Sequence, residues 1–378
     1  MGKRFFDLVH DVKGRFSPAL FFDFLKRRKK HAGPALTSRH PRSSFKTGSV
    51  KAPERTAAER VLKKVIISTT INTPTEAIRK YDAMKDWTLV VAGDLKTPKD
   101  YRLERGIYIS PEEQEKYHPE LSEAIGWNDH GRRNFACLWA KDLEADIIAV
   151  IDDDNIPLEG WGEDLLAGRQ VEVDFYETGL EAFDPLGATN YPHLWHRGFP
   201  VQLVSKRSYL NKTRKVIRAD IQADLWNGDP DVDAICRMAH SPDCLFEPSV
   251  FPLASSKPAP FNTQNIFITR DVLPYFFILP GLTPHGRVGD IWTAYHVQAL
   301  GFQVLFNRPS VYHARHVHNL TTDMIDEYLS YEKSIEVVRS IQDKSYDPVR
   351  FWPARTLQGY KLYQQCFAQA AVSAGSAL

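Results

Sequence analysis

The stretch Ile147-Ile148-Ala149-Val150-Ile151-Asp152-Asp153-Asp154-Asn155 decides the fold prediction. Its five apolar residues run directly into three carboxylates, so 147–151 is predicted to be a buried strand that brings acidic side chains to a sheet edge. Three neighbouring like charges repel one another unless a cation neutralises them, and hard oxygen ligands suit Mg²⁺ or Mn²⁺. Open α/β sheets bind ligands at this edge. The alternative is an acidic turn punctuated by Asn155 and Pro157.

Strand and helix patterns alternate on both sides of this stretch. We expect further strands at 65–70 and 87–94 and helices at 75–85 and 130–143. This alternation predicts βαβ units, and therefore an α/β fold with a mixed, mostly parallel sheet flanked by helices. From about residue 170 the pattern dissolves into Pro-, Trp- and Asp-rich segments typical of long loops. It returns as a strand at 266–269, a helix at 290–300, a strand at 303–306 and a helix at 322–341.

The chain is uneven in charge. Its first 60 residues hold 15 Lys/Arg and 5 Asp/Glu, a balance of +10, whereas the whole chain of 378 residues has a net charge of +1. We predict a basic aromatic arm at 1–30, a linker at 31–60, a catalytic domain at 61–335 and a helical tail at 336–378. Two interpretations of the arm stay open: peripheral contact with an anionic membrane surface, or packing on the body or a partner chain.

Composition excludes several classes of protein. Cys137, Cys236, Cys244 and Cys366 form no CxxC pair, so we expect neither a disulfide framework nor a zinc site, and a reducing, cytoplasmic location fits better. No apolar run approaches the roughly 20 residues of a transmembrane helix. Because the body is acidic, nucleic acid is not expected as its partner.

Four motifs, in order along the chain, carry a resemblance to a known family. They are Val91-Ala92-Gly93-Asp94-Leu95-Lys96-Thr97-Pro98, Asp152-Asp153-Asp154, Asn227-Gly228-Asp229-Pro230-Asp231-Val232-Asp233-Ala234 and Gly286-Arg287-Val288-Gly289-Asp290-Ile291-Trp292. Together they resemble the STELLO-type glycosyltransferases, and their order is similar to that in the reversibly glycosylated polypeptides, which are UDP-arabinopyranose mutases. The acidic triplet resembles the DXD motif of GT-A glycosyltransferases. The resemblance covers roughly 62–335.

This resemblance implies a GT-A-like, Rossmann-like fold and a metal-dependent transferase. The enzyme would move a sugar from a nucleotide sugar, UDP-linked by the resemblance, to a glycan, lipid-linked or protein acceptor. Two alternatives stay open: a mutase that interconverts pyranose and furanose forms of a UDP-sugar, and a non-catalytic sugar-nucleotide-binding scaffold for a glycan synthase. A product assay without acceptor separates the mutase from the transferase.

The resemblance also implies ligands for a divalent ion and for the nucleotide. Asp154 matches the family's metal ligand, with Asp152 on the metal or the ribose, Asp153 in support, and His313 as a nitrogen ligand to Mn²⁺ or Mg²⁺. A bound ion would neutralise the diphosphate and act as a Lewis acid. The other expected nucleotide contacts are Thr69, Thr70, Asn72, Asp94, Lys96, Arg132 and Arg133. Turn chemistry is the alternative explanation for the Thr, Asn and Asp residues at the strand ends.

Catalytic and sugar contacts are expected from the second half of the chain. Asp290 matches a position that faces the sugar and acts as general base in inverting enzymes, although a helix N-cap explains it equally well. Arg197, in His196-Arg197-Gly198-Phe199-Pro200, is similar to the arginine that mutases glycosylate, and gripping the donor diphosphate is its other role. The expected sugar contacts are Trp226, Asp229, Asp231, Asp233, Asn262 and Gln264. Solvated loop charges and a β-turn are the alternatives for them.

Overall fold

The structure is a computed structural model that describes residues 61–283, 286–314 and 319–375. The chain divides into two units, residues 1–59 and 60–378, and only the second is described. The predicted arm at 1–30, its membrane contact and the linker therefore lie outside the described residues.

Eleven strands of the described residues form one sheet. They are β1 (Lys64–Thr70), β2 (Thr88–Gly93), β3 (Ile107–Ile109), β4 (Ile147–Ile151), β5 (Asn155–Pro157), β6 (Gln170–Tyr176), β7 (Lys212–Arg218), β8 (Ile221–Gly228), β9 (Leu253–Ser255), β10 (Asn265–Thr269) and β11 (Val304–His313). The described α-helices are α2 (Glu76–Asp82), α3 (Pro111–Tyr117), α4 (Pro119–Ile125), α5 (Arg133–Asp142), α6 (Ala234–His240), α7 (Gly289–Ala299), α8 (Leu320–Gln342) and α9 (Ala354–Gly375). A 3₁₀ turn, η2 (His130–Arg132), leads into α5.

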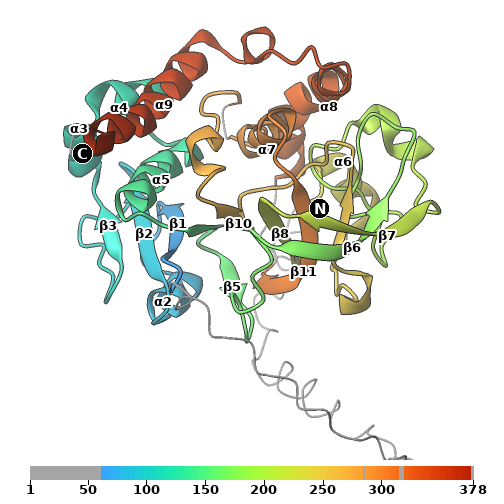
Figure 1. The fold of residues 1–378 in the computed structure, drawn as a ribbon, viewed down its shortest axis with the longest axis horizontal. Coiled ribbons are helices and arrows are strands. Elements are labelled where there is room, and N and C mark those ends of the chain that lie inside the picture. The colour runs from blue at the N-terminus through green and yellow to red at the C-terminus, as the bar shows by residue number, and fades with distance from the viewer. Residues whose placement is uncertain (1–60, 284–285, 315–318, 376–378) are drawn as a thin grey trace, which may run out of the picture. The chain divides into compact units, whose positions relative to one another are not determined.

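Strand order places the carboxyl ends of several strands at the same edge of the sheet. The order is β3-β2-β1-β4-β10-β8-β11-β9-β6-β7, with β5 paired to β11. The part β3-β2-β1-β4 is wholly parallel, β10 runs antiparallel to both β4 and β8, and β8 is parallel to β11. Strands β1, β2, β4, β8 and β11 therefore all point the same way, and their carboxyl ends share one edge (Figure 1).

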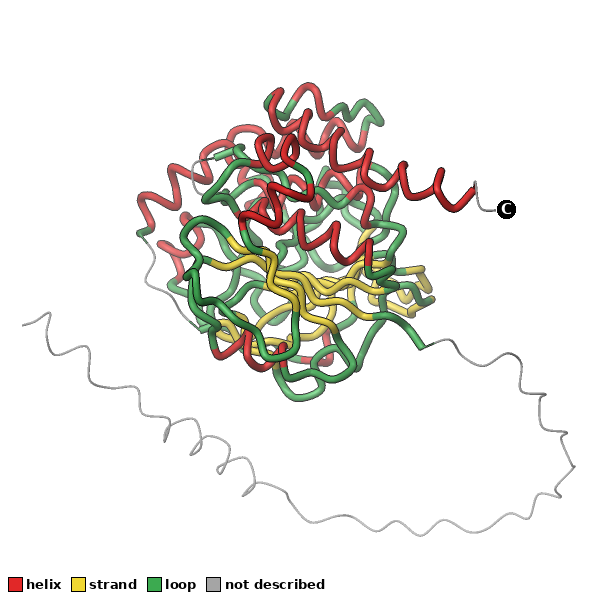
Figure 2. The backbone as a smooth tube through the Cα atoms, turned by 90° about the vertical axis from the view of Figure 1, so that its left-hand side faces the viewer, coloured by secondary structure: helices red, strands yellow, loops and turns green. Residues whose placement is uncertain are grey.

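Helices cover the central strands of the sheet, which are largely buried on both faces. Strand β4 is buried along its whole length, as its unbroken apolar sequence requires. Figure 2 shows the strands as a single layer with helical segments on either side of it. The Trp161 ring adds to the core by packing against Tyr81, Trp87 and Phe267, with ring centroids 4.8 to 5.2 Å away.

Strand β11 joins three parts of the sheet and carries an irregularity. Its last residue, His313, is opposite Gly228 of β8 on one side and Asn155 of β5 on the other. Between Asn307 and Val311 the register against β8 shifts, so that four steps along β11 match two steps from Asp224 to Trp226. After this bulge β11 pairs with β8 again and also with β5, so that the strand ends beside the acidic triplet.

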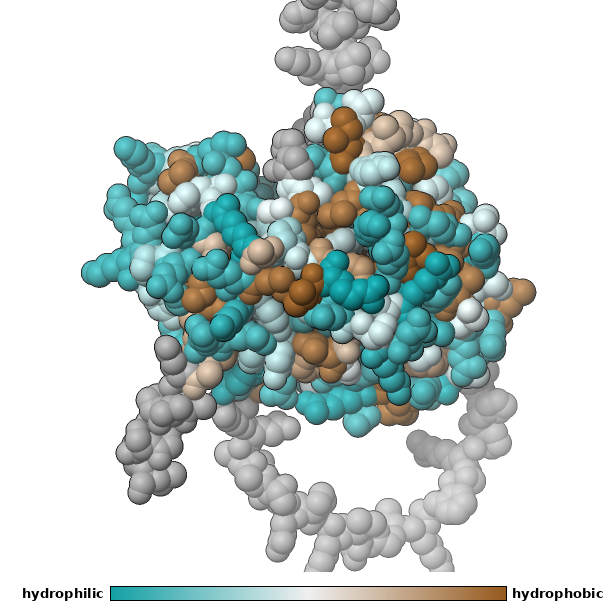
Figure 3. All heavy atoms as spheres, turned by 90° about the horizontal axis from the view of Figure 1, so that it is seen from above, coloured by the Kyte–Doolittle hydropathy of each residue, from teal (hydrophilic) through white to brown (hydrophobic). Residues whose placement is uncertain are grey.

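The predicted α/β class, with a mixed sheet flanked by helices, is confirmed. The strand predicted at 147–151 matches β4, and the helix predicted at 130–143 begins as η2 and continues as α5. The predicted boundary at 335 falls inside α8, and α9 packs against α4 within the same unit. None of the described helices is long and apolar enough to span a membrane. Polar residues cover most of the face shown in Figure 3, with apolar residues in scattered groups.

Candidate active site

A polar cavity of about 330 Å³ opens at the carboxyl edge, where β1, β2 and β4 end. It is lined by Thr69, Thr70, Ile71, Asn72, Asp94, Lys96, Asn128, Asp129, His130 and Asp153. Six of these ten residues are ones that the sequence predicted to contact the nucleotide. Asn128, Asp129 and His130 were not predicted. The available signal was their place just before the helix that leads into the strand of the acidic triplet.

Asp94 shapes one wall of this cavity through backbone contacts. Its carboxylate accepts hydrogen bonds from the N–H groups of Leu95, Asn128 (2.9 Å) and Asp129 (3.3 Å). The residue is 3% exposed. Asp94 thus fixes the loop at 128–130 against the end of β2, and any contact that it makes with a ligand adds to this structural role.

The three carboxylates of the acidic triplet face three different partners. Asp152 pairs with the guanidinium of Arg133, which also donates to the Thr263 hydroxyl at 2.7 Å. Burial raises the pKa of Asp152 to about 6, and the Arg133 charge opposes this rise. In the structure these two side chains pair with each other. The predicted contact between Arg133 and the nucleotide and the predicted metal ligation by Asp152 stay predictions.

Asp153 points into the cavity and organises its floor. One carboxylate oxygen, Oδ2, accepts hydrogen bonds from the Thr70 hydroxyl and from Asn72 Nδ2, the latter at 3.0 Å. Its backbone carbonyl accepts from the Thr75 hydroxyl, which also caps α2. The end of β1, the start of α2 and the triplet are thus held as one unit around the cavity.

Asp154 faces His313 across the sheet edge, with 3.7 Å between Oδ2 and Nε2. Strand register brings them together, because β11 places His313 opposite Asn155. The ring's other nitrogen, Nδ1, lies 2.8 Å from the Asp229 carbonyl, to which it can donate, which leaves Nε2 directed at Asp154. Burial lowers the pKa of His313, but hydrogen bonding to Asp154 and to the Asp229 backbone raises it to about 9.

This pair has the donor chemistry of a divalent-metal site. A histidine whose second nitrogen donates to a carbonyl is oriented as metal-binding histidines are, and a carboxylate with an imidazole suits Mn²⁺ better than Mg²⁺. Within the described ranges, no group of three or more His, Cys, Asp or Glu residues could hold an ion by itself. His316 and His318, the other imidazoles of this segment, lie outside the described residues.

Arg197 and Asp290 are brought together, but as an ion pair. All five N–H groups of Arg197 are used: they reach both carboxylate oxygens of Asp231 at 2.7 and 2.9 Å, both oxygens of Asp290 at 3.0 and 2.7 Å, and the Arg287 carbonyl. The three side chains are 7 to 8% exposed. With every donor occupied in the structure, Arg197 has no N–H group left over for a diphosphate. Its role is to hold Asp231 and Asp290 in place.

Several other predicted contacts are interior residues. Arg132 is fully buried and donates to Gln114 and Ser122 from beneath the Trp127 ring, so it does not reach the cavity. Trp226 is 3% exposed and offers no stacking surface. Asp229 pairs with Arg237, and Asp233 caps α6 while accepting from Trp195. Arg132 was predicted to contact the nucleotide and the other three residues to contact the sugar. In the structure Arg132, Asp229 and Asp233 are engaged by partners elsewhere in the fold, and Trp226 is buried.

Asn262 and Gln264 connect the ion-pair cluster to the triplet. Asn262 donates from Nδ2 to Asp231 at 2.7 Å and accepts from the Gln264 N–H at 3.1 Å. The Gln264 carbonyl in turn accepts from the Asp152 N–H at 3.2 Å. Their predicted contact with a sugar stays a prediction, and the structure gives them a bridging position between the two halves of the site.

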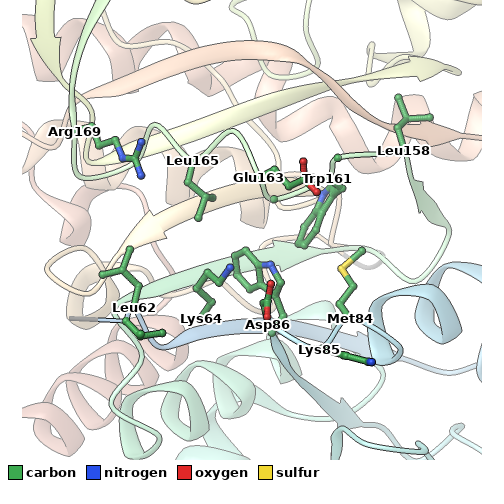
Figure 4. Close-up of a pocket in the computed structure, with 14 residues that line it drawn as sticks. Leu62, Lys64, Met84, Lys85, Asp86, Leu158, Trp161, Glu163, Leu165 and Arg169 are labelled. Atoms are coloured by element: carbon green, nitrogen blue, oxygen red, sulfur yellow. The ribbon is translucent and has the colours of Figure 1, made fainter. Parts of the chain in front are cut away.

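A second and larger cavity, of about 650 Å³, lies at the opposite edge of the sheet. It is bounded on one side by the loop that carries Trp161, Glu163 and Arg169, and on the other by Lys64 and Asp86 near the starts of β1 and β2 (Figure 4). None of the residues that the sequence predicted for the site lines it. The acidic motif and the polar strand ends select the smaller cavity as the candidate active site.

Comparison with known proteins places the chain beside proteins described as glycosyltransferases. It is 25% identical over 191 residues to "Probable glycosyltransferase STELLO2" of Arabidopsis thaliana, covering 47% of this chain and 25% of that one. It is 24% identical over 200 residues to "Probable glycosyltransferase STELLO1" of the same plant, covering 48% and 26%. The resemblance inferred from the motifs is thereby confirmed. The match spans about a quarter of the length of these relatives.

Two further comparisons add little. No protein-family model matches the chain. A solved structure described as "Crystal structure of GalNAc-T7 with UDP, GalNAc and Mn2+" is 11% identical, covers 82% of this chain and 55% of its own, and gives a TM-score of 0.36. A likeness at that TM-score supports no conclusion about this chain.

Proposed function

We propose that this chain is a metal-dependent glycosyltransferase that takes its sugar from a UDP-linked donor. The observation that carries the proposal is the divergence of the acidic triplet at one sheet edge. Asp153 lines a polar cavity sized for a nucleoside, and the next residue, Asp154, faces the Nε2 atom of His313 at 3.7 Å. Successive residues of one turn thus serve a nucleoside site and a metal site, as a nucleoside diphosphate requires.

The nucleoside would occupy the cavity between β1 and β2. Thr69, Thr70, Asn72 and Lys96 line it with hydroxyl, amide and ammonium groups, which are suited to the hydroxyls of a ribose and the polar edge of a base. Lys96 is exposed and is one charge available to a phosphate. Hydrogen bonding to buried polar groups gives such a site its selectivity.

The diphosphate would lie between this cavity and His313. Asp154 and His313 would hold a divalent ion, Mn²⁺ by the chemistry of the two donors, and the ion would neutralise the phosphates as they leave. The sugar would then extend toward Asp290, which we retain as the candidate general base. Because Arg197 holds both Asp290 oxygens, the carboxylate is fixed in orientation, and only its remaining lone pairs are available to an acceptor hydroxyl.

Thermal unfolding of the full chain with UDP, with and without Mn²⁺, tests the binding half of the proposal. UDP at about 100 times its dissociation constant stabilises the fold by roughly 2.7 kcal/mol, enough for a measurable rise in Tm. We expect Mn²⁺ to add to the UDP shift in the wild type and in Asp86→Asn, an exposed aspartate at the opposite cavity. We expect Asp154→Asn to lose the Mn²⁺ increment. Retention of that increment would remove Asp154 from the metal site.

Turnover is tested separately by UDP release from a panel of UDP-sugars with Mn²⁺ and candidate acceptors. A transferase releases UDP in an acceptor-dependent way. A new UDP-sugar formed without acceptor would identify a mutase instead. Binding without turnover of any donor would identify a sugar-nucleotide-binding scaffold. Asp290→Asn should abolish UDP release while leaving the Mn²⁺-dependent thermal shift, because Asp154 and His313, and not Asp290, would hold the metal.

A further inference from the structure

His130 lies between the proposed nucleoside cavity and the segment that leads to Asp290. Its imidazole lines the cavity and is 22% exposed. Behind it, the backbone at Gly286 and Gly289 approaches the ring so closely that a methyl group at Gly286 would overlap Nδ1, and one at Gly289 would sit 3.0 Å from Nε2. The side chain thus borders the cavity and also packs against the segment that leads into α7.

The chain around His130 is tied in two directions. Toward the cavity, the N–H groups of Asn128 and Asp129 donate to the Asp94 carboxylate. Toward the other segment, Asp129 Oδ2 accepts from the Gly281 N–H at 2.9 Å. These anchors hold the backbone of 128–130 in place, so a change in the position of the imidazole must be taken up by its packing neighbours.

The imidazole itself has weak anchors. Its Nε2 atom is buried with no hydrogen-bond partner among the described residues, and its Nδ1 atom lies 3.5 Å from Asp129 Oδ1. Because neither ring nitrogen has a short hydrogen bond, directional bonds do not lock the ring in position. A buried polar nitrogen without a partner also costs stability. Its position is set by packing between whatever fills the cavity and the two glycines behind it.

We propose that His130 is a positioning residue that couples nucleoside binding to the placement of Asp290. A nucleoside in the cavity presses on or orders the imidazole, and the imidazole fixes Gly286 and Gly289. Gly289 is the first residue of α7 and immediately precedes Asp290, and Gly286 lies just before the helix. Coupling of this kind is reciprocal: a change at the glycine segment must alter UDP affinity by the same factor by which UDP alters that segment. The inference rests on the proposed function, because it needs the nucleoside in this cavity.

Hydrogen exchange of the full chain, read at the amides of 286–292, tests the coupling in the forward direction. With Mn²⁺ and UDP, we expect these amides to become more protected in the wild type. In His130→Ala, at a UDP concentration that saturates the variant, we expect that added protection to be lost. Equal protection in both proteins would overturn the inference while leaving the proposed function intact. If the wild type binds no UDP, the proposed function fails and the inference fails with it.

A pair of glycine variants tests the reverse direction. Gly286→Ala and Gly301→Ala both place an alanine at a positive φ, +74° and +97°, but only the first meets the His130 ring, whereas the second has no atom within 4 Å. Neither glycine lines the cavity. We expect Gly286→Ala to weaken UDP binding about tenfold, and Gly301→Ala to weaken it much less. Equal effects of the two variants would mean that backbone strain alone is responsible, and the coupling through His130 would be refuted.

Discussion

Replacing Arg197 with methionine should destabilise the protein strongly. The guanidinium is 7% exposed and has five hydrogen bonds, four of them to the carboxylates of Asp231 and Asp290. Methionine fills much of the space but leaves two buried carboxylates without their cation. Breaking a buried ion pair in this way costs about 3 to 5 kcal/mol, a large part of the usual 5 to 15 kcal/mol of folding stability.

The assay is urea unfolding of the wild type and the variant, followed by tryptophan fluorescence. Arg214→Met is the matched control, because Arg214 also contacts two carboxylates, those of Glu172 and Asp174, but is 55% exposed. Solvent screens such a pair, so the control should lose far less stability. The reasoning is refuted if Arg197→Met costs no more than the control.

The loss of stability in Arg197→Met should also depend on pH. The Arg197 charge, against the opposing effect of burial, holds the pKa of Asp231 well below its usual range. A depressed carboxylate pKa contributes stability above the ordinary aspartate pKa, and that contribution is lost as the pH falls. In Arg197→Met this contribution is absent, and the orphaned carboxylates can take up protons. The stability gap between wild type and variant should therefore narrow from pH 7 to pH 4, and a constant gap would contradict the assignment.

Two further predictions concern buried groups with opposite pH dependence. Burial lowers the pKa of His296 from 6.5 to about 4, so the neutral ring stabilises the fold above pH 6.5 and up to about 3 kcal/mol is lost on acidification toward pH 4. In His296→Phe the free energy of unfolding should change less between pH 6.5 and pH 4. The measurement is urea unfolding at several pH values, and a pH dependence equal to that of the wild type would contradict the prediction. Burial raises the pKa of Asp233 to about 7, so the folded state retains a proton there and stability falls as the pH rises from 4 to 7. Asp233→Asn still has a side chain that can cap α6, and its stability relative to the wild type should rise from pH 4 to pH 7. A variant that loses stability relative to the wild type over that range would refute the prediction.

The gathering of the site at one sheet edge could be predicted because it depends on strand direction. Thr70, Asp94 and Asp152 each stand at the end of an apolar strand, and parallel strands bring such residues together whatever their side chains do. The Asp154–His313 pair was predicted from the family resemblance, and the structure supplies the reason, which is the pairing of β11 with β5. The position of the cavity and of the triplet could therefore be predicted from the sequence.

Side-chain partners could not be predicted, because they depend on contacts between distant elements. Arg132 and Arg133 are neighbours, yet one is enclosed by Gln114 and Ser122 of helices that were not predicted, and the other reaches Asp152. Likewise, the run of alternating carboxylates after β8 resembles an exposed acidic loop. Asp231 pairs with Arg197, which lies 34 residues away, and no local sequence pattern predicts this pair.

The bulge in β11 has a consequence for comparing related chains. Side chains on a strand alternate between faces, so the irregularity between Asn307 and Val311, which adds two residues relative to β8, keeps His313 on the face of the sheet that meets Asp154. An insertion or deletion of one residue at 308–310 would turn that imidazole to the other face, whereas a change of two would preserve it. Homologues that keep this histidine in the same role should therefore differ in length here only by even numbers.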